Sequence, residues 1–303
     1  MSDLIRPIGW FMRYFPDATL APHFWLTQLD MPLIRKVGPA MDIAWAGEAV
    51  VIELAYSLPK DVPQNRPWAY MPIYRVHGLD AILSRLKSKE LFAESISESG
   101  GDREAILLDP YGHPIALRER SVSAGLPQDQ EARRRWMRGE AFNPGCKPMP
   151  EGFQEIGWIQ RRVADMARMS DFYKTVVGLA DLGTHNGRPL FDLGDNVILE
   201  LVPGGTVMTP PQDRKEADAL IIMRVDQIEK YRAHLEVHGT TIINRKIDVY
   251  WGEVSYFVDP EGQVIGLENA KHPGTYAPEK AALTEGLEAE RRWREKMGRQ
   301  QYA

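Results

Sequence analysis

Cysteine is almost absent from this sequence of 303 residues, which contains only Cys146. A single thiol excludes an internal disulfide framework and any zinc site built from several thiolates. The first 16 residues mix Asp3, Arg6 and Arg13 with apolar side chains and lack the apolar core and cleavage pattern of a signal peptide. Both features favour a reducing compartment, so we expect a cytoplasmic protein.

Long apolar runs and an excess of positive charge are missing as well. No uninterrupted apolar stretch reaches the roughly 18 residues that span a membrane. The net charge is -5, which leaves no broad basic surface to neutralise phosphates. We therefore expect neither a membrane nor a nucleic acid as a partner.

What the chain does contain is one internal duplication. A composition of 44% hydrophobic and 26% charged residues is that of a globular protein, and its length suits two domains. Matching segments recur in the same order at offsets of 147 to 150 residues. They are Ile8-Gly9-Trp10 with Ile156-Gly157-Trp158, Phe24-Trp25 with Phe172-Tyr173, Val51-Ile52-Glu53-Leu54 with Ile198-Leu199-Glu200-Leu201, Arg75-Val76 with Arg224-Val225, and Asp109-Pro110-Tyr111-Gly112 with Asp259-Pro260-Glu261-Gly262.

Each repeat predicts a strand, a helix, short strands, a strand ending in Glu-Leu, a strand ending in Arg-Val, a second helix and a hairpin. Apolar spacing supports the helices, and Asp-Pro-x-Gly provides the chemistry of a turn between strands. The expected boundaries are a first domain at 1–120, a linker at 121–153 with a docked charged helix at 129–138, a second domain at 154–271, and a helical tail at 272–303.

Several of these segments resemble one known family, the vicinal-oxygen-chelate superfamily, which contains glyoxalases, bleomycin-resistance proteins and extradiol dioxygenases. The similar segments are Val163-Ala164-Asp165, Ser170-Asp171-Phe172-Tyr173, Gly178-Leu179, the hairpin Val258 to Ile265, and the strand Glu48 to Leu54. The resemblance covers residues 8–119 and 156–269. It implies an α+β fold with two tandem domains, each made of two βαβββ modules that form cupped mixed sheets around a cavity.

The resemblance also implies where a metal would bind, and most of those positions have lost their ligands. Metal-using members converge imidazole and carboxylate donors on one point. Only one such donor per repeat survives, Glu53 or Glu200, and a single carboxylate cannot hold a catalytic metal. The other positions carry Trp10 and Trp158, Met71 and Leu220, and Ala116 and Gly266. We predict no metal and no cofactor, with Glu268 as the only credible displaced ligand.

Strand alternation predicts which side chains line the cavities, because residues two apart share a face. Glu53 and Glu200 are the candidate catalytic bases, since desolvation raises the pKa of a carboxyl group towards neutrality. The alternative is that each glutamate forms a buried ion pair with Arg224 or Arg75. The candidate substrate-binding residues are Trp10, Tyr14, Arg75, Trp158, Gln160, Arg162 and Arg224.

Three functions remain open from the sequence. The first is a metal-independent isomerase or lyase that moves a proton on a small anionic, aromatic or hydrophobic molecule. The second is a protein that binds or sequesters a small molecule without catalysis, and the third is an extradiol-type dioxygenase with displaced metal ligands. A monomer and a homodimer are both compatible with the sequence. If one cavity is shared across the repeats, Glu200 would face Arg75 and Met71.

Overall fold

A strand, a helix and three further strands follow one another four times along the chain. The computed structural model describes residues 5–16, 18–37, 41–45, 50–56, 68–99, 101–120, 125–138, 149–249 and 252–270. The predicted tail at 272–303 and Cys146 lie outside these residues.

The first repeat supplies two of these βαβββ modules. The first module contains β1 (Ile5–Tyr14), the short π-helix η2 (His23–Gln28), β2 (Leu33–Val37), β3 (Met41–Trp45) and β4 (Val51–Ala55). The second contains β5 (Tyr70–Val76), α1 (Leu79–Lys87), β6 (Ser95–Ser99), β7 (Asp102–Leu108) and β8 (Pro114–Arg120). Helix α2 (Pro127–Met137) then forms the charged helix predicted for the linker.

The second repeat supplies the other two modules. The third contains β9 (Phe153–Val163), α3 (Met166–Asp171), the π-helix η3 (Phe172–Val177), β10 (Ala180–His185), β11 (Arg188–Gly194) and β12 (Val197–Pro203). After the short helix η4 (Arg214–Glu216), the fourth contains β13 (Ala219–Val225), α4 (Ile228–Val237), β14 (Thr241–Val249), β15 (Gly252–Val258) and β16 (Val264–Ala270).

The Asp-Pro-x-Gly segments form hairpin turns, as the sequence predicted. The carboxylate of Asp109 accepts the backbone N–H groups of Tyr111 and His113, both at 2.9 Å. Asp259 makes the same two bonds in the second repeat. An aspartate that binds the backbone N–H two residues ahead fixes such a turn, so β7 and β8, and likewise β15 and β16, pair as antiparallel neighbours.

The strands form two eight-stranded mixed sheets, and each sheet takes half of its strands from each repeat. Sheet A has the order β14-β15-β16-β13-β1-β4-β3-β2, and sheet B has the order β10-β11-β12-β9-β5-β8-β7-β6. The joins are antiparallel, between β1 and β13 in sheet A and between β5 and β9 in sheet B. The first module of each repeat therefore pairs with the second module of the other.

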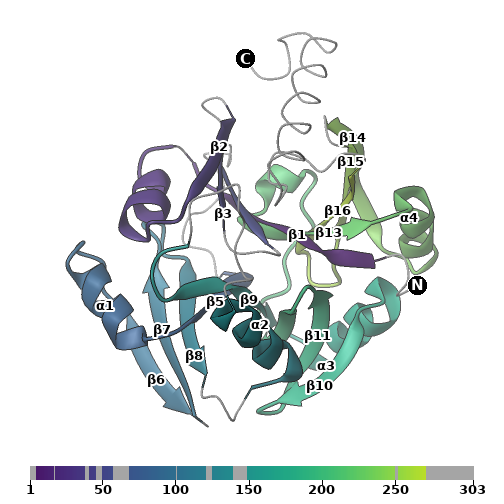
Figure 1. Cartoon of the computed structure of the whole chain (residues 1–303). Coiled ribbons are helices and arrows are strands. Elements are labelled where there is room, and N and C mark those ends of the chain that lie inside the picture. The colour runs from purple at the N-terminus through teal and green to yellow at the C-terminus, as the bar shows by residue number, and fades with distance from the viewer. Residues whose placement is uncertain are drawn as a thin grey trace.

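One continuous hydrophobic core joins the two sheets and their helices. It includes Phe11 and Ile221 from sheet A, Tyr74 and Ile159 from sheet B, and Tyr231 from α4. Helix α4 packs on β14 and β16, helix α1 packs on β8, and the two helices lie on opposite outer sides of the molecule (Figure 1). The α+β fold of four βαβββ modules and two cupped mixed sheets is thus confirmed.

Candidate functional site

Each sheet has a second face, turned away from the common core, which we call cup A in sheet A and cup B in sheet B. Separate clusters of buried apolar side chains cover these faces. In cup A the cluster includes Trp10, Met12, Tyr14, Val51, Leu220, Ile222, Val254 and Tyr256. In cup B it comprises Met71, Ile73, Ala116, Trp158, Leu190 and Ile198. Strand alternation therefore assigned the tryptophans to the correct face.

A contact between the repeats explains why Ile-Gly-Trp and Arg-Val both recur. In cup B the guanidinium group of Arg75 covers Gly157, where an added Cβ atom would lie 2.4 Å from Arg75 Cζ. In cup A a Cβ atom on Gly9 would lie 2.9 Å from Arg224 Nε and 2.5 Å from Glu268 Oε1. Only glycine leaves room for these side chains, so glycine and arginine recur together.

In cup A, Glu268 binds both Trp10 and Arg224, two residues that recur in the second cup as Trp158 and Arg75. Its two carboxylate oxygens accept Trp10 Nε1 and Arg224 Nε, each at 2.8 Å. Glu268 is fully buried, and Arg224 keeps 28% of its side chain exposed. The predicted substrate-binding residue Arg224 is thus already paired, and the pairing partner is Glu268 rather than Glu53.

Glu53 lies in cup A, in the middle of β4. The residue is 5% exposed, and within the described part of the chain no hydrogen bond or ion pair reaches its carboxyl group. Burial raises the pKa of Glu53 to about 7; the charge of Arg214 opposes this effect and that of Glu268 adds to it. The alternative prediction, an ion pair of Glu53 with Arg224 or Arg75, is therefore wrong, because Arg224 binds Glu268 and Arg75 binds Asp129 and Glu155.

Arg214 brings two tyrosines of cup A together. Its NH1 atom donates to Tyr256 Oη at 2.9 Å and to Tyr14 Oη at 3.3 Å, and its guanidinium group stacks 5.0 Å from the Tyr256 ring centre. Burial raises the pKa of Tyr256 to about 12 and that of Tyr14 further. Both phenols therefore keep their protons at neutral pH and can donate them in hydrogen bonds.

Glu200, the equivalent of Glu53 in cup B, has a crowded polar environment. It is fully buried and accepts Gln160 Nε2 at 2.8 Å, Arg188 NH1 at 3.2 Å and Arg118 NH2 at 3.5 Å. It borders a pocket of about 180 Å³. An ion pair for Glu200 was expected with Arg75 or Arg224, and the structure corrects its partners to Arg118 and Arg188.

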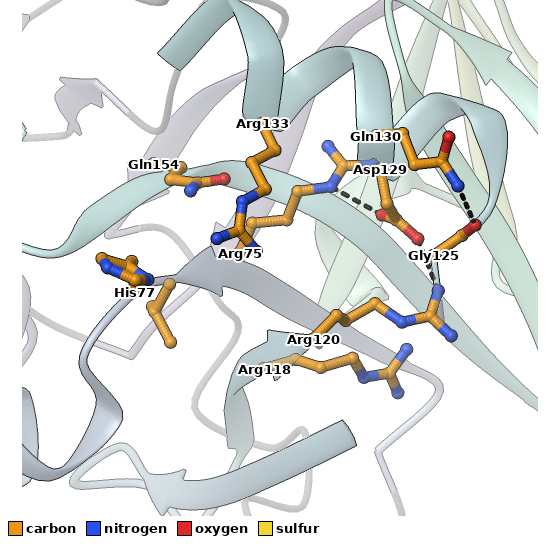
Figure 2. A pocket seen from close by; sticks show the side chains of 10 residues that line it. Arg75, His77, Arg118, Arg120, Gly125, Asp129, Gln130, Arg133 and Gln154 are labelled. Atoms are coloured by element: carbon orange, nitrogen blue, oxygen red, sulfur yellow. Dashed lines mark hydrogen bonds and ion pairs between the residues drawn. The ribbon is translucent and has the colours of Figure 1, made fainter. Parts of the chain in front are cut away.

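Helix α2 covers the other side of cup B through Asp129. Asp129 Oδ1 accepts Trp158 Nε1 at 2.9 Å and Arg75 Nε at 2.8 Å, while Oδ2 accepts Arg120 NH1 at 2.5 Å. Figure 2 shows Asp129 pointing from the helix towards these arginines. Arg75 also binds Glu155, so it does not face Glu200, although Met71 does lie opposite Gln160 in the same sheet.

Arg162, the remaining predicted binding residue, lies at the end of β9. Its guanidinium group stacks 4.6 Å from the ring centre of Trp68, which packs against the apolar cluster of cup B. Sequence reasoning missed Arg214, Tyr256 and Asp129. Tyr256 shares the alternation of β15 with Val254 and was detectable, whereas Arg214 and Asp129 lie outside the duplicated strands and carried no repeat signal.

The described residues do not fit the metal that the fold resemblance implies. Among the described residues, no group of three or more histidine, cysteine, aspartate or glutamate side chains has the geometry to hold an ion. Glu268 and Glu200 already accept N–H donors on both carboxylate oxygens. Of the three described glutamates Glu53, Glu200 and Glu268, these bonds leave only Glu53 without such donors, and one carboxylate is too few for a transition metal.

Comparison with known proteins identifies the family of the second repeat. Residues 155–267 match the family model described as the Glyoxalase/Bleomycin resistance protein/Dioxygenase superfamily. This segment is a domain of that superfamily, as its sequence resemblance predicted. It spans the third and fourth modules, which contribute to different sheets. No curated protein sequence matches the chain.

Solved structures extend the likeness of fold to the whole chain. Glyoxalase I from Zea mays has a TM-score of 0.63 and 15% identity, covering 94% of this chain and 96% of that chain. A candidate dioxygenase from Bacillus subtilis subsp. subtilis str. 168 has a TM-score of 0.64 and 12% identity, with the same coverage. These similarities establish the fold alone. Among the described residues, no helix is long and apolar enough to cross a membrane.

Proposed function

We propose that this protein is a metal-independent enzyme, an isomerase or lyase, that moves a proton on a small anionic molecule of aromatic or hydrophobic character. Cup A is its active site and Glu53 its general base. The observation that carries the proposal is the Glu53 carboxyl group, which is buried, has no ion-pair partner among the described residues, and has its pKa raised to about 7. A base with this pKa exchanges protons effectively at neutral pH.

Tyr14, Tyr256 and Arg214 supply the complementary acid side of the site. Each tyrosine oxygen accepts a hydrogen bond from the same Arg214 nitrogen. The phenolic O–H of each tyrosine can therefore donate to a substrate oxygen. When Glu53 takes a proton from carbon, the C–H electron pair moves onto the neighbouring carbonyl and forms an enolate. Two O–H donors and the adjacent positive charge stabilise that oxyanion.

The second half of the reaction returns the proton or releases a group. In an isomerase, the enolate is conjugated with a further double bond, and Glu53 returns its proton to the far carbon of that system and ends in its starting state. In a lyase, the enolate electrons expel a leaving group from the β-carbon, and this group takes the proton from Glu53, which again restores the base. The walls supplied by Trp10, Met12, Val51 and Ile222 are apolar, which favours a hydrophobic or aromatic substrate.

Glu200 is not the base in this proposal. Both oxygens of the Glu200 carboxylate already accept hydrogen bonds, from Arg118, Arg188 and Gln160, so these donors stand between the carboxylate and a substrate proton. The two equivalent glutamates therefore provide a matched experiment: Glu53→Gln removes the proposed base, and Glu200→Gln makes the same chemical change in cup B.

Proton transfer is testable without the natural substrate. The protein is incubated in D2O with a panel of small carbonyl acids, phenylpyruvate among them, and loss of each α-proton signal is followed by NMR against a protein-free blank. We expect Glu53→Gln to slow catalysed exchange by about 100-fold or more, and Glu200→Gln to retain it. Equal exchange by wild type and Glu53→Gln would refute the assignment of the base. Binding without exchange would favour the alternative, a small-molecule binding protein.

A further inference from the structure

The two cups contain the same tryptophan and arginine pair, but the carboxylate that each pair binds has a different origin. In cup A, Trp10 and Arg224 bind Glu268, which belongs to β16 of the same sheet. In cup B, the equivalent pair binds Asp129, which belongs to α2 and lies outside both sheets. Cup B thus obtains its carboxylate from a segment with no place in the βαβββ modules.

The strand of sheet B that corresponds to β16 does not supply this carboxylate. The position equivalent to Glu268, 150 residues earlier, is Arg118, so a negative side chain is replaced by a positive one. Arg118 donates from Nε to Glu104 at 2.7 Å, while its buried NH1 atom has no hydrogen-bond partner among the described residues. A buried, unpaired guanidinium N–H is costly, and it leaves cup B with an unused donor for an anion.

Space remains beside the Asp129 carboxylate. A cavity of about 40 Å³ lies between α2 and the sheet, and the side chains of Arg75, Arg118, Arg120 and Arg133 line it (Figure 2). A single water needs roughly 10–15 Å³ of such volume, so the cavity has room for a few atoms beyond the two carboxylate oxygens.

Asp129 is also the main attachment of α2. In this helix only Asp129 and Ala132 are buried, so α2 contributes little apolar area to hold it in place. Burial alone would raise the pKa of Asp129, but the charges of Arg75 and Arg120 outweigh it and lower that pKa below its usual value. Asp129 is therefore a buried, ionised carboxylate that ties α2 to cup B, while Trp136 of the same helix packs against His77.

We propose that cup B contains a carboxylate-binding site, formed by Arg75, Arg120 and Trp158, which the chain fills with its own Asp129. Two donors converge on one oxygen and the third binds the other, an arrangement suited to a planar carboxylate. A small monocarboxylate takes the place of Asp129 when α2 is displaced. This site is separate from Glu53 and does not depend on the chemistry in cup A.

Chemical rescue tests the proposal on the full-length protein. Asp129→Ala removes the internal carboxylate, and its melting temperature is measured in sodium acetate, sodium sulfate and sodium chloride of equal ionic strength. We expect acetate to raise the melting temperature of Asp129→Ala by on the order of 2 °C or more relative to chloride, as a ligand that binds only the folded state does. Wild type and the control Glu131→Ala, on the exposed face of the same helix, should show no such difference.

The other outcomes would overturn the proposal. Equal melting temperatures of Asp129→Ala in acetate and chloride would mean that Asp129 is a structural ion-pair partner only. Equal rescue by sulfate would contradict the carboxylate class. If Asp129→Ala does not fold, the melting temperature of Asp129→Ser is measured in the same three salts. This variant loses the charge but keeps an oxygen that can accept a hydrogen bond from Trp158 Nε1. Equal melting temperatures in acetate and chloride, or equal rescue by sulfate, would overturn the proposal in the same way.

Discussion

At the scale of single residues, Glu53 and Glu200 show how one repeated position acquires two chemistries. Both lie in the middle of their strands, Glu53 in β4 and Glu200 in β12, and both are buried. Glu200 is surrounded by Gln160, Arg118 and Arg188. Glu53 is close enough to Tyr14 and Tyr256 to affect their pKa values, and the charge of Arg214 lowers the pKa of Glu53 without forming an ion pair among the described contacts. Neighbouring groups, rather than the glutamate itself, therefore decide which of the two can exchange a proton.

The stability of the two glutamine variants should change in opposite directions. Because the folded-state pKa of Glu53 is about 7 and the ordinary value is 4.5, the folded protein keeps a proton that the unfolded chain loses between these pH values. The free energy of unfolding thus falls as pH rises through this window, by up to about 3 kcal/mol. Glu53→Gln removes this penalty and should be more stable than wild type at pH 8, with little difference below pH 4.5.

Glu200→Gln should instead lose stability, because it leaves the buried Arg118 and the partly exposed Arg188 without their shared carboxylate. Breaking a buried ion pair typically costs about 3 kcal/mol. Urea unfolding followed by circular dichroism at pH 5 and pH 8 measures both variants. A gain in stability for Glu200→Gln, or a loss for Glu53→Gln at pH 8, would contradict the environments described for the two cups.

The sequence predicted the strand residues of the site and missed the residues that connect them. Duplication marked Glu53, Trp10 and their equivalents, and alternation put them on the correct faces. Arg214 precedes β13 in a segment that has no matching segment in the first repeat. It joins the site only because the fold brings it to Tyr14, about 200 residues earlier in the chain. Contacts of that kind follow from tertiary structure and leave no local pattern in the sequence.

At the scale of secondary-structure elements, the cups depend on close contact between strands of different repeats. Gly157 on β9 lies under the guanidinium group of Arg75 on β5, which Asp129, Glu155 and the Asn196 carbonyl hold in place. The sequence revealed these strands through their recurrence. It could not show that the glycine of one repeat packs on the arginine of the other, because each motif is consistent with either partner.

Gly157→Ala should therefore destabilise the protein by about 1–3 kcal/mol, since the new methyl group displaces a firmly bonded guanidinium group. The matched control is Gly187→Ala in the turn between β10 and β11, where an added Cβ meets nothing within 4 Å and only the left-handed backbone, with φ of 75°, is strained. Thermal unfolding of both variants tests the contact. A Gly157→Ala cost no larger than that of Gly187→Ala would show that Arg75 moves aside freely.

At the scale of the whole molecule, the sheets join the two repeats into one folding unit. Each sheet contains four strands from each repeat, and the common core includes residues of both. Hydrophobic periodicity and duplication identified four modules but not their pairing, because equivalent strands have equivalent patterns. The pairing follows from the antiparallel contacts of β1 with β13 and of β5 with β9.

Neither repeat should form its native sheets alone. We expect fragments 1–143 and 149–303, produced together, to purify as a 1:1 complex with the far-ultraviolet circular dichroism of the intact chain. Either fragment alone would expose the edge of a half-sheet and should aggregate or pair with a second copy of itself. A fragment that is a stable, cooperatively unfolding monomer would contradict the interleaved arrangement.

The protonation of Glu53 at neutral pH decides whether cup A holds a general base. The Glu53 carboxyl group is titrated by NMR in protein labelled with carbon-13 at glutamate Cδ, with Glu53→Gln used to assign its signal. We expect a midpoint near pH 7, the value to which burial raises the pKa of this group. A midpoint at the ordinary value of about 4.5 would show a solvated or ion-paired carboxylate, and cup A would then lack the base on which the proposed reaction depends.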